Sequence, residues 1–307
     1  MITKDIVKFN EFGNCLKISD GITEALITID FGPRIIRYGF IEGENVLCDT
    51  LHKNEIPLSG EVFDKFYYEG ACWNNYGGHR LWISPESLPE TYYPDKDAAP
   101  YELTENGAIF TPKAQIENGV QHIIDVHYEE TELVVSHKVI NISENEKEFA
   151  VWALSVSALN GIEIIPFNTN DTGLLHNRQI SIWPYTDLRD ERIYLGHKYA
   201  TIIQKDLPTN LKIGFNLNEG KVYYVVNNTT FKVCFDVNKN GVYPDNNVCF
   251  ETYSCKDFTE IETLSELKLV KSGESITHNE KWSLFKTPCE FNAKDDDSID
   301  NFITKLK

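Results

Sequence analysis

The sequence is poor in basic residues. It has 29 Lys and Arg against 47 Asp and Glu, which gives a formal net charge of −18 at pH 7. Nucleic acids and anionic membrane surfaces are bound mainly through basic patches, so this balance predicts neither a nucleic-acid partner nor a membrane partner. The acidic residues are spread along the chain, and their simplest role is to keep the protein soluble.

Long apolar runs and paired cysteine motifs are also missing. No stretch approaches the roughly 20 apolar residues that a membrane-spanning helix needs, and the segment Met1–Ile6 has no hydrophobic signal-peptide core. The seven cysteines are scattered and form no C-x-x-C pair. Unpatterned cysteines without an export signal predict reduced thiols in a cytoplasmic protein and argue against a zinc ribbon.

The known cofactor signatures are absent too. The sequence contains no G-x-x-x-x-G-K-[ST] loop, no G-x-G-x-x-G after a strand and no H-E-x-x-H motif. We therefore expect neither a bound cofactor nor a metal ion.

Amphipathic helices are scarce, whereas strand signals recur along the whole chain. β-branched and aromatic runs alternate with turn markers such as Asn160-Gly161 and Asn240-Gly241. Many short strands without helical crossovers predict an all-β fold, a large antiparallel β-sandwich, and no linker divides residues 1–307 into domains. One short helix is expected in the tail, 295–307, and polar loops near 41–60 and 86–106 are long enough to bind a ligand.

The densest group of chemically useful side chains runs from 73 to 95. Two glycines, which permit close backbone approach, precede His79, Arg80 and Trp82. Flat aromatic rings suit the C–H faces of sugars, and Arg or carboxylate groups suit their hydroxyls. This pattern predicts a sugar-binding surface that includes Tyr76, Arg80, Trp82 and Glu86. The alternative is a strand–turn–strand in which Trp82 is part of the core and Arg80 pairs with Glu86.

A second group has a similar mix of amide, guanidinium, aromatic and carboxylate side chains. Asp187, Arg189 and Asp190 in this group can equally form a surface ion-pair cluster, which contributes little energy. The candidate substrate-binding residues here are Asn177, Arg178, Trp183, Tyr185 and Asp187.

Two glutamates lie in strand-like stretches near the C-terminal end. Glu251 stands in an apolar run, and Glu262 stands in a more polar one. A carboxylate on a buried strand costs several kcal/mol unless it is paired, so such residues are usually neutralised or functional. Both are candidate catalytic residues, and the apolar neighbours of Glu251 favour it.

These motifs together resemble a bacterial family of unknown function that is grouped with the galactose mutarotase-like proteins. The resemblance extends from about Asn14 to Trp282, and it implies a β-sandwich with a sugar-sized groove on one sheet. It rests on the following segments: 32–37, 76–82, 85–86, 92–95, 177–178, 183–187, 243–245 and 260–264.

The resemblance also implies a chemistry. Aldose 1-epimerases of this superfamily open and close a sugar ring with a glutamate base and a histidine acid. Glu251 or Glu262 would be the base, and Arg80 resembles the substrate-binding arginine. The strand in 149–155 has no histidine where the epimerases carry their acid, so His79 or His176 would have to supply it.

Three interpretations therefore remain open. The first is an aldose mutarotase-like isomerase that uses Glu251 or Glu262 with His79. The second is a non-catalytic carbohydrate-binding protein that uses the same groove. The third is a lyase- or hydrolase-like relative acting on oligosaccharides, and a hydrolase would need two carboxylates at a glycosidase spacing. In each case the partner is a small sugar or an oligosaccharide.

Overall fold

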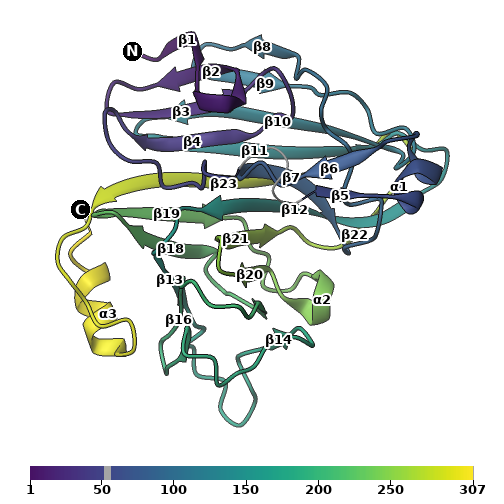
Figure 1. The fold of residues 1–307 in the computed structure, drawn as a ribbon. Helices are drawn as coiled ribbons and strands as arrows, with labels where there is room; N and C mark the ends of the chain where they lie inside the picture. Colours follow the sequence, from purple (N-terminus) through teal and green to yellow (C-terminus); the bar gives the residue numbers. More distant parts are fainter. Residues whose placement is uncertain (52–56, 307) are drawn as a thin grey trace.

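Two large antiparallel sheets form the framework of the computed structural model, which describes residues 1–51 and 57–306 (Figure 1). The first sheet has, in spatial order, β1 (Thr3–Lys8), β2 (Asn14–Ser19), β3 (Thr23–Thr28), β4 (Ile35–Phe40), β7 (Gly78–Ser84), β12 (Lys147–Ser157), β21 (Thr259–Leu264), β20 (Phe250–Ser254), β17 (Leu211–Phe215) and β14 (Ile180–Ile182), with β22 (Lys268–Val270) paired to β12.

The second sheet has ten strands and faces the first. Its order is β15 (Ile193–Leu195), β16 (Tyr199–Ile203), β13 (Ile162–Pro166), β18 (Lys221–Val226), β19 (Thr229–Phe235), β23 (Ser275–Lys286), β11 (Glu132–Asn141), β10 (Val120–Glu129), β9 (Gly107–Phe110) and β8 (Tyr101–Leu103). The smaller elements are β5 (Pro57–Ser59), β6 (Cys72–Asn74), the 3₁₀ helix Asn10–Phe12, α1 (Glu61–Phe66), α2 (Pro244–Asn247) and α3 (Asp296–Ile303).

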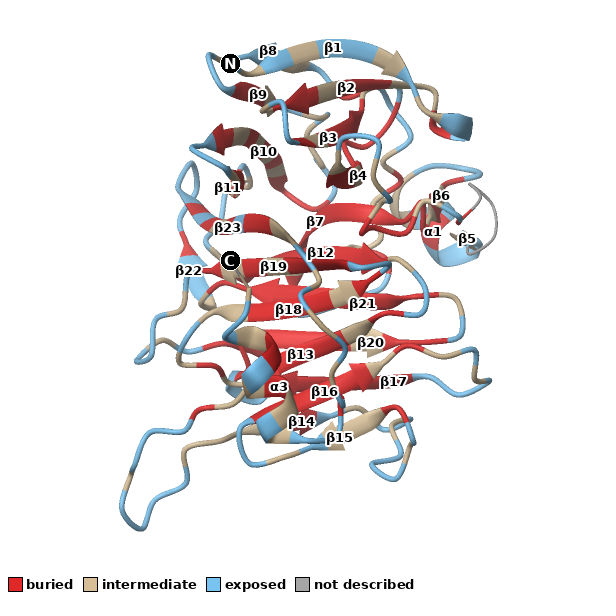
Figure 2. Ribbon diagram, turned by 90° about the vertical axis from the view of Figure 1, so that its left-hand side faces the viewer, coloured by how far each residue is buried: buried red, intermediate tan, exposed pale blue. Residues whose placement is uncertain are grey.

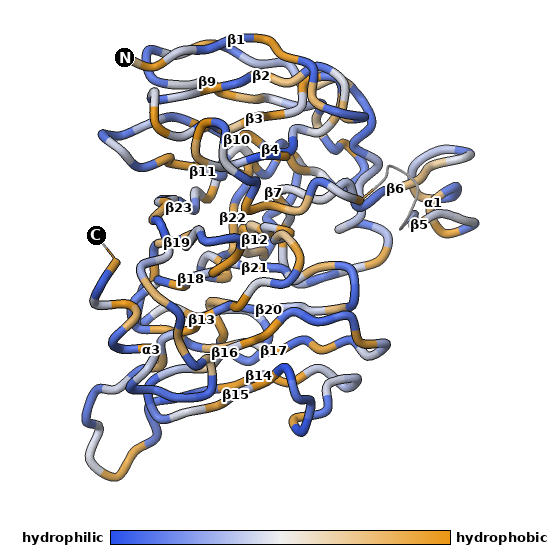
Figure 3. The backbone as a smooth tube through the Cα atoms, turned by 60° about the vertical axis from the view of Figure 1, so that its left-hand side comes forward, coloured by the Kyte–Doolittle hydropathy of each residue, from blue (hydrophilic) through white to orange (hydrophobic). Residues whose placement is uncertain are grey.

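The core lies between the two sheets. Along β10, buried and partly exposed residues alternate with the period of two expected of a strand with one buried face. Trp282 on β23 is fully buried and packs against Tyr38 of β4, with ring centres 5.4 Å apart. Figure 2 shows buried residues concentrated in both stacked sheets, and in Figure 3 the connecting loops are mostly hydrophilic.

The sequence prediction of an all-β sandwich is confirmed. The expected tail helix is present as α3, where the side chain of Asp295 accepts a hydrogen bond from the backbone N–H of Ser298. Ile299 and Phe302 of this helix pack on the outer side of the second sheet. The short helix α1 was not predicted, because six residues carry too little periodicity to detect.

The excursion between β4 and β7 positions the candidate site. Its elements β5, α1 and β6 lie on the outer face of the first sheet, away from the second sheet (Figures 1 and 2). There Phe63 and Trp73 pack with Trp82, Trp152 and Leu154 in a hydrophobic cluster separate from the main core. The predicted loop 41–60 leads into this excursion, and residues 52–56 of that loop lie outside the described residues.

Within the described residues, no helix is long and apolar enough to cross a membrane. The seven cysteines are all free thiols, as the sequence predicts.

Candidate functional site

A cavity of about 240 Å³ opens on the outer face of the first sheet, beneath the β5–α1–β6 excursion. We call it the groove. Central strands contribute alternate residues to its floor, and loops contribute its rim. It is lined by Leu58, Trp73, Asn75, Arg80, Trp82, Glu86, Tyr92, Trp152, Leu154, Tyr185, Lys212, Tyr253, Glu260 and Glu262.

Strand alternation explains which side chains reach the groove. Arg80 and Trp82 on β7 point into it, whereas the intervening Leu81 joins the core between the sheets. On β21, Glu260 and Glu262 point into it, whereas Ile261 joins that same core. The groove floor is therefore one face of a continuous run of paired strands.

Three buried ionisable groups form a cluster at the centre of the groove floor and directly behind it. The ammonium of Lys212 lies 2.9 Å from Oε2 of Glu251 and 2.9 Å from Oε2 of Glu262. Trp152 donates its indole N–H to the same oxygen of Glu262 at 3.0 Å. Glu251 and Glu262 are cross-strand partners in register, which is why one lysine can bind both.

Burial perturbs these groups strongly. It raises the pKa of Glu262 to about 7, although the positive charge of Lys212 opposes the shift. The pKa of Glu251 is raised well above its ordinary value, again by burial. Burial opposes the charge on Lys212, but the adjacent Glu262 and Glu251 outweigh it and raise the pKa. The cluster therefore holds a charged lysine beside two carboxyl groups whose protonated forms are favoured by burial.

The remaining oxygen of Glu262, Oε1, has no hydrogen-bond partner in the described part of the chain. Glu262 lines the groove, and this oxygen is itself buried. Oε1 of Glu251 is also unpartnered, but Glu251 stands behind the lysine and does not line the groove.

A second ion pair lies at the other side of the floor. Arg80 Nη1 contacts Glu260 Oε1 at 2.8 Å. The guanidinium also lies over the ring of Trp82, 4.0 Å from its centre, with Trp73 at 5.6 Å. Contacts with ring faces are favourable for a guanidinium, so this arginine is fixed on three sides. Aromatic faces and paired charges thus alternate across the groove.

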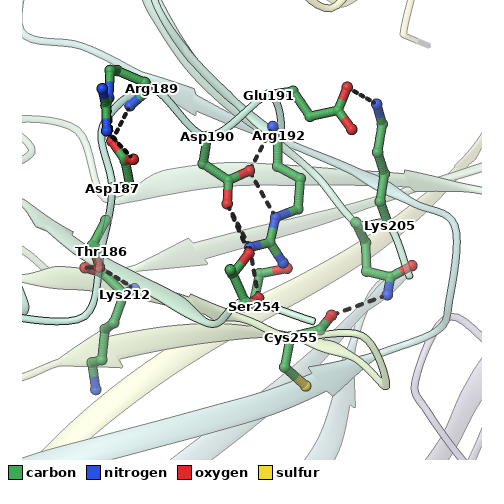
Figure 4. Close-up of polar contacts among 12 residues, drawn as sticks. Thr186, Asp187, Arg189, Asp190, Glu191, Arg192, Lys205, Lys212, Ser254 and Cys255 are labelled. Carbon is green, nitrogen blue, oxygen red and sulfur yellow. Dashed lines mark hydrogen bonds and ion pairs between the residues drawn. The ribbon is translucent and has the colours of Figure 1, made fainter. Parts of the chain in front are cut away.

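Tyr185 lines the groove from a loop, and hydrogen bonds to β17 hold this loop in place. Thr186 Oγ donates to the backbone carbonyl of Lys212 at 2.9 Å and accepts from its N–H at 2.8 Å. Further along, Asp190 binds the buried Arg192 through two side-chain hydrogen bonds (Figure 4). The loop is therefore tied to β17, the strand that supplies the lysine.

Comparison with known proteins was informative only at the level of structure. No family model and no curated protein matches the sequence. A galactose mutarotase-like protein from Clostridium acetobutylicum superposes with a TM-score of 0.57 and 14% identity over 93% of this chain and 98% of its own. A galactose mutarotase-like protein from Lactobacillus casei gives 0.55 and 9% identity over 88% and 99%.

The chain has the galactose mutarotase-like fold. A TPR-domain containing protein from Parabacteroides distasonis also superposes, with a TM-score of 0.58 and 14% identity over 90% of this chain. The present chain spans 48% of the length of that protein.

Four of the sequence-predicted binding residues meet in the groove of this galactose mutarotase-like fold. They are Arg80, Trp82, Glu86 and Tyr185. Of the candidate bases, Glu262 lines the groove and Glu251 binds Lys212 behind it. The alternative pairing of Arg80 with Glu86 does not occur, because Arg80 binds Glu260 and Glu86 accepts from Tyr92.

Other predicted residues lie elsewhere. Tyr76 is buried among core aromatics, 4.3 Å from the ring of Phe31. The side chain of Asn177 donates to a loop carbonyl, and Arg178 stacks on Phe167.

Asp187 forms an exposed ion pair with Arg189, as the surface alternative predicted (Figure 4). Trp183 does not line the groove, but its ring centre is 4.8 Å from the ammonium of Lys212.

His79 lies on the opposite face of β7 from the groove. It is fully buried between the sheets, where its Nδ1 contacts Ser155 Oγ at 2.8 Å and its Nε2 contacts His137 Nε2 at 2.6 Å. Nδ1 of His137 must donate to the carbonyl of His278, so its Nε2 accepts a hydrogen bond from the Nε2–H of His79. Both nitrogens of His79 are thus occupied in a neutral ring, and burial lowers its pKa well below the ordinary value.

His79, His137 and Glu280 are also the residues most able to hold a metal, since their ligand atoms lie within 4.8 Å of one another. The rings of His79 and His137, however, point their Nε2 atoms directly at each other. The ring centres are 4.9 Å apart and the two Nε2 atoms are 2.6 Å apart. That is the geometry of an N–H···N hydrogen bond. Both oxygens of Glu280 accept bonds from Thr263 and Trp282. The cluster is therefore hydrogen-bonded without an ion.

The two glycines before His79 have a structural task. Gly77 and Gly78 have φ angles of 80° and 65°. A Cβ on either residue would lie within 2.5 Å of a backbone carbonyl oxygen, that of Cys48 or of Ile35. The close approach that the sequence suggested is thus to neighbouring backbone, and these glycines allow β7 to enter the sheet.

Two further cavities are less suited to a sugar. One of about 40 Å³ is lined by Arg34, Asp95 and His122 and has room only for a few waters. The other, of about 460 Å³, lies beside α3, where its charged side chains are largely exposed and pair with one another, as Lys198 does with Asp300. Neither combines aromatic faces with a buried carboxyl of raised pKa.

The sequence interpretation missed Lys212, and it did not select Trp152, Tyr253 or Glu260 for the site. A lysine between Leu211 and Ile213 in a strand-like run was the available signal, because a charge on a buried strand needs a partner. Its partners lie 39 and 50 residues away in the sequence, and only the strand order brings them together.

Proposed function

We propose that this protein binds a sugar in the groove and interconverts its anomers by opening and closing the ring. One observation carries the proposal. Glu262 lines an aromatic-walled cavity, keeps one buried carboxyl oxygen without a hydrogen-bond partner among the described residues, has a pKa raised to about 7, and is held 2.9 Å from a lysine ammonium. A carboxyl with a pKa near the working pH is suited to general base catalysis.

The chemistry needs one base and one acid. Glu262 takes the proton of the anomeric hydroxyl, and Lys212 donates a proton to the ring oxygen as the bond between that oxygen and the anomeric carbon breaks. The product is the open-chain aldehyde. The proton held on Glu251 restores Lys212, and reversal of these transfers closes the ring on either face of the aldehyde. Acid–base groups of this kind contribute roughly 10²–10⁴-fold.

Lys212 has the donor capacity for this task. An ammonium has three N–H groups, and two are directed to Glu251 and Glu262. The third N–H has no acceptor among the described residues, and Lys212 lines the groove. A lysine in this position compensates for the absence of a histidine among the groove-lining residues that the structure describes.

The walls suit a single sugar ring. Tyr92 and Tyr253 offer aromatic rings for C–H groups, whereas Arg80 already lies over the ring of Trp82, and Glu86 stands at the rim to accept hydroxyl donors. A cavity of about 240 Å³ is slightly below the range of roughly 300–1,000 Å³ for drug-sized ligands. It therefore favours a monosaccharide, or one end of a longer sugar.

A non-catalytic sugar-binding protein is the second candidate, and the lack of a groove histidine favours it. The two candidates separate in one experiment. Wild-type protein is mixed with a panel of aldoses, and NMR measures both line broadening on binding and magnetisation exchange between the α and β anomers. Accelerated exchange supports the isomerase, binding without exchange supports the binding protein, and neither effect with any aldose would overturn both.

A further inference from the structure

Each cation in the groove is already neutralised. Arg80 contacts Glu260 at 2.8 Å, and Lys212 contacts both Glu251 and Glu262 at 2.9 Å. All of these side chains are at most 10% exposed. No other Lys, Arg or His lines this groove among the residues that the structure describes. Each cation in the groove is therefore already held by a carboxylate, although Nε of Arg80 has no hydrogen-bond partner among the described residues.

The cations are also fixed in place. Arg80 lies against Trp82 and Trp73, and Lys212 lies 4.6 Å from the ring centre of Trp152. An anionic ligand could recruit either cation only by displacing its carboxylate partner. That exchange would leave a buried carboxylate unpaired, which is strongly unfavourable.

The electrostatic field of the groove also disfavours an anionic ligand. Glu86, Glu260 and Glu262 line the groove against two cations, and Glu251 stands directly behind. Three carboxyl groups thus line the groove against two cations. The whole chain carries −18, so an approaching anion also meets an unfavourable long-range field.

The groove is instead rich in acceptors. Glu262 Oε1 has no partner, and the Glu86 carboxylate stands at the exposed rim. Hydroxyl and ammonium groups are donors that carboxylates bind well. A phosphate or carboxylate substituent would add negative charge to a lining in which carboxylates already outnumber cations.

We infer that the groove selects uncharged sugars and amino sugars and rejects sugar phosphates and uronic acids. This inference rests on the proposed function, since it names the chemical class of sugar that the same groove takes. It assigns the discrimination to the Arg80–Glu260 and Lys212–glutamate pairs.

The test compares sugars that differ in charge at one position. Binding is measured by calorimetry for D-glucose and D-galactose, their 6-phosphates, their uronic acids, and the corresponding 2-amino sugars with their N-acetyl derivatives as neutral controls. We expect the neutral or amino form to bind at least about tenfold more tightly than the anionic form, the order expected of one unscreened charge in a partly buried site.

Glu260→Gln sharpens the test by releasing Arg80. We expect this variant to gain affinity for the 6-phosphates and uronic acids. The logarithm of the affinity ratio between each neutral sugar and its anionic form should fall by at least half. Glu219→Gln is the matched control, because it removes the same charge from an exposed position away from the groove. It should leave the discrimination unchanged.

Salt provides a measurement that needs no variant. Near 1 M salt the Debye length falls to about 3 Å, and the preference for uncharged over anionic sugars should shrink in the wild-type protein. An anionic sugar that binds as tightly as its neutral parent at low salt overturns the inference while leaving sugar binding intact. Failure of every sugar to bind overturns the proposed function and the inference with it.

Discussion

The ammonium of Lys212 lies 2.9 Å from Glu262 on the floor of the groove, and the same nitrogen is equally close to Glu251. One lysine thus joins two carboxyl groups on adjacent strands, of which only one reaches the ligand cavity. This arrangement separates a residue that can exchange a proton with a ligand from one that stores a proton.

The first prediction concerns pH. Only the ionised form of Glu262 can accept a proton, and burial raises its pKa to about 7. The rate of anomer exchange under saturating sugar should therefore rise as the pH increases through about 7 and then level off. NMR exchange spectroscopy across this range measures the profile, and a rate that falls over the same interval would exclude Glu262 as the base.

The second prediction concerns Trp152, a positioning residue that donates to Glu262 at 3.0 Å. A donor to a carboxylate favours its charged form. Trp152→Phe keeps an aromatic ring but removes the N–H, so the midpoint of the pH profile should move to higher pH. Trp183→Phe is the matched control, since Trp183 also lies beside Lys212 but makes no hydrogen bond to Glu262. An unchanged midpoint in Trp152→Phe would contradict the assigned role.

The third prediction is that His79 contributes to stability in the interior and not to catalysis in the groove. His79 is hydrogen-bonded between the sheets to Ser155 and His137. His79→Gln should lower the free energy of unfolding by about 1–3 kcal/mol, because it leaves buried partners unsatisfied. Its effect on anomer exchange should be small at a temperature where the variant is folded. Urea unfolding and exchange rates measure the two effects, and a 100-fold loss of rate in stably folded protein would return His79 to a catalytic role.

The fourth prediction concerns stability and Glu280. Burial raises its pKa from 4.5 to about 7, so the folded state prefers the protonated form. The stability that this preference contributes is fully present below about pH 4.5 and is lost as the pH rises through 7. The loss is on the order of 3 kcal/mol.

Glu280→Gln should lack this part of the pH dependence, because glutamine does not titrate. The wild-type free energy of unfolding, measured relative to the variant in urea, should fall between pH 4.5 and about 8. The exposed Glu219→Gln should show no such change. Parallel curves for wild type and Glu280→Gln would show that Glu280 does not titrate as described.

The sequence predicted the fold well because its signals are local. The apolar runs around β3, β4, β11 and β18 and the capping Asp295 of α3 need no knowledge of distant contacts. The segment from β7 likewise supplied Arg80 and Trp82, which remain neighbours in the groove.

The rest of the site depends on which way strands face and on which strands pair. The alternation within β7 places His79 on the opposite face from Arg80, and the sequence contained that information. The choice between Glu251 and Glu262 required the register of β20 with β21. Lys212 joins the site only because β17 pairs with β20, and no local pattern encodes that neighbour.

The account is tested most directly by the rate of anomer exchange in Glu262→Gln relative to wild type. Both proteins are measured near pH 8 with the same aldose at matched occupancy, and their stabilities are compared first. We expect the variant to bind the sugar within a few-fold of wild type and to lose roughly 10²–10⁴-fold in rate. A variant that binds the sugar and exchanges its anomers as fast as wild type would contradict the proposal that Glu262 is the base.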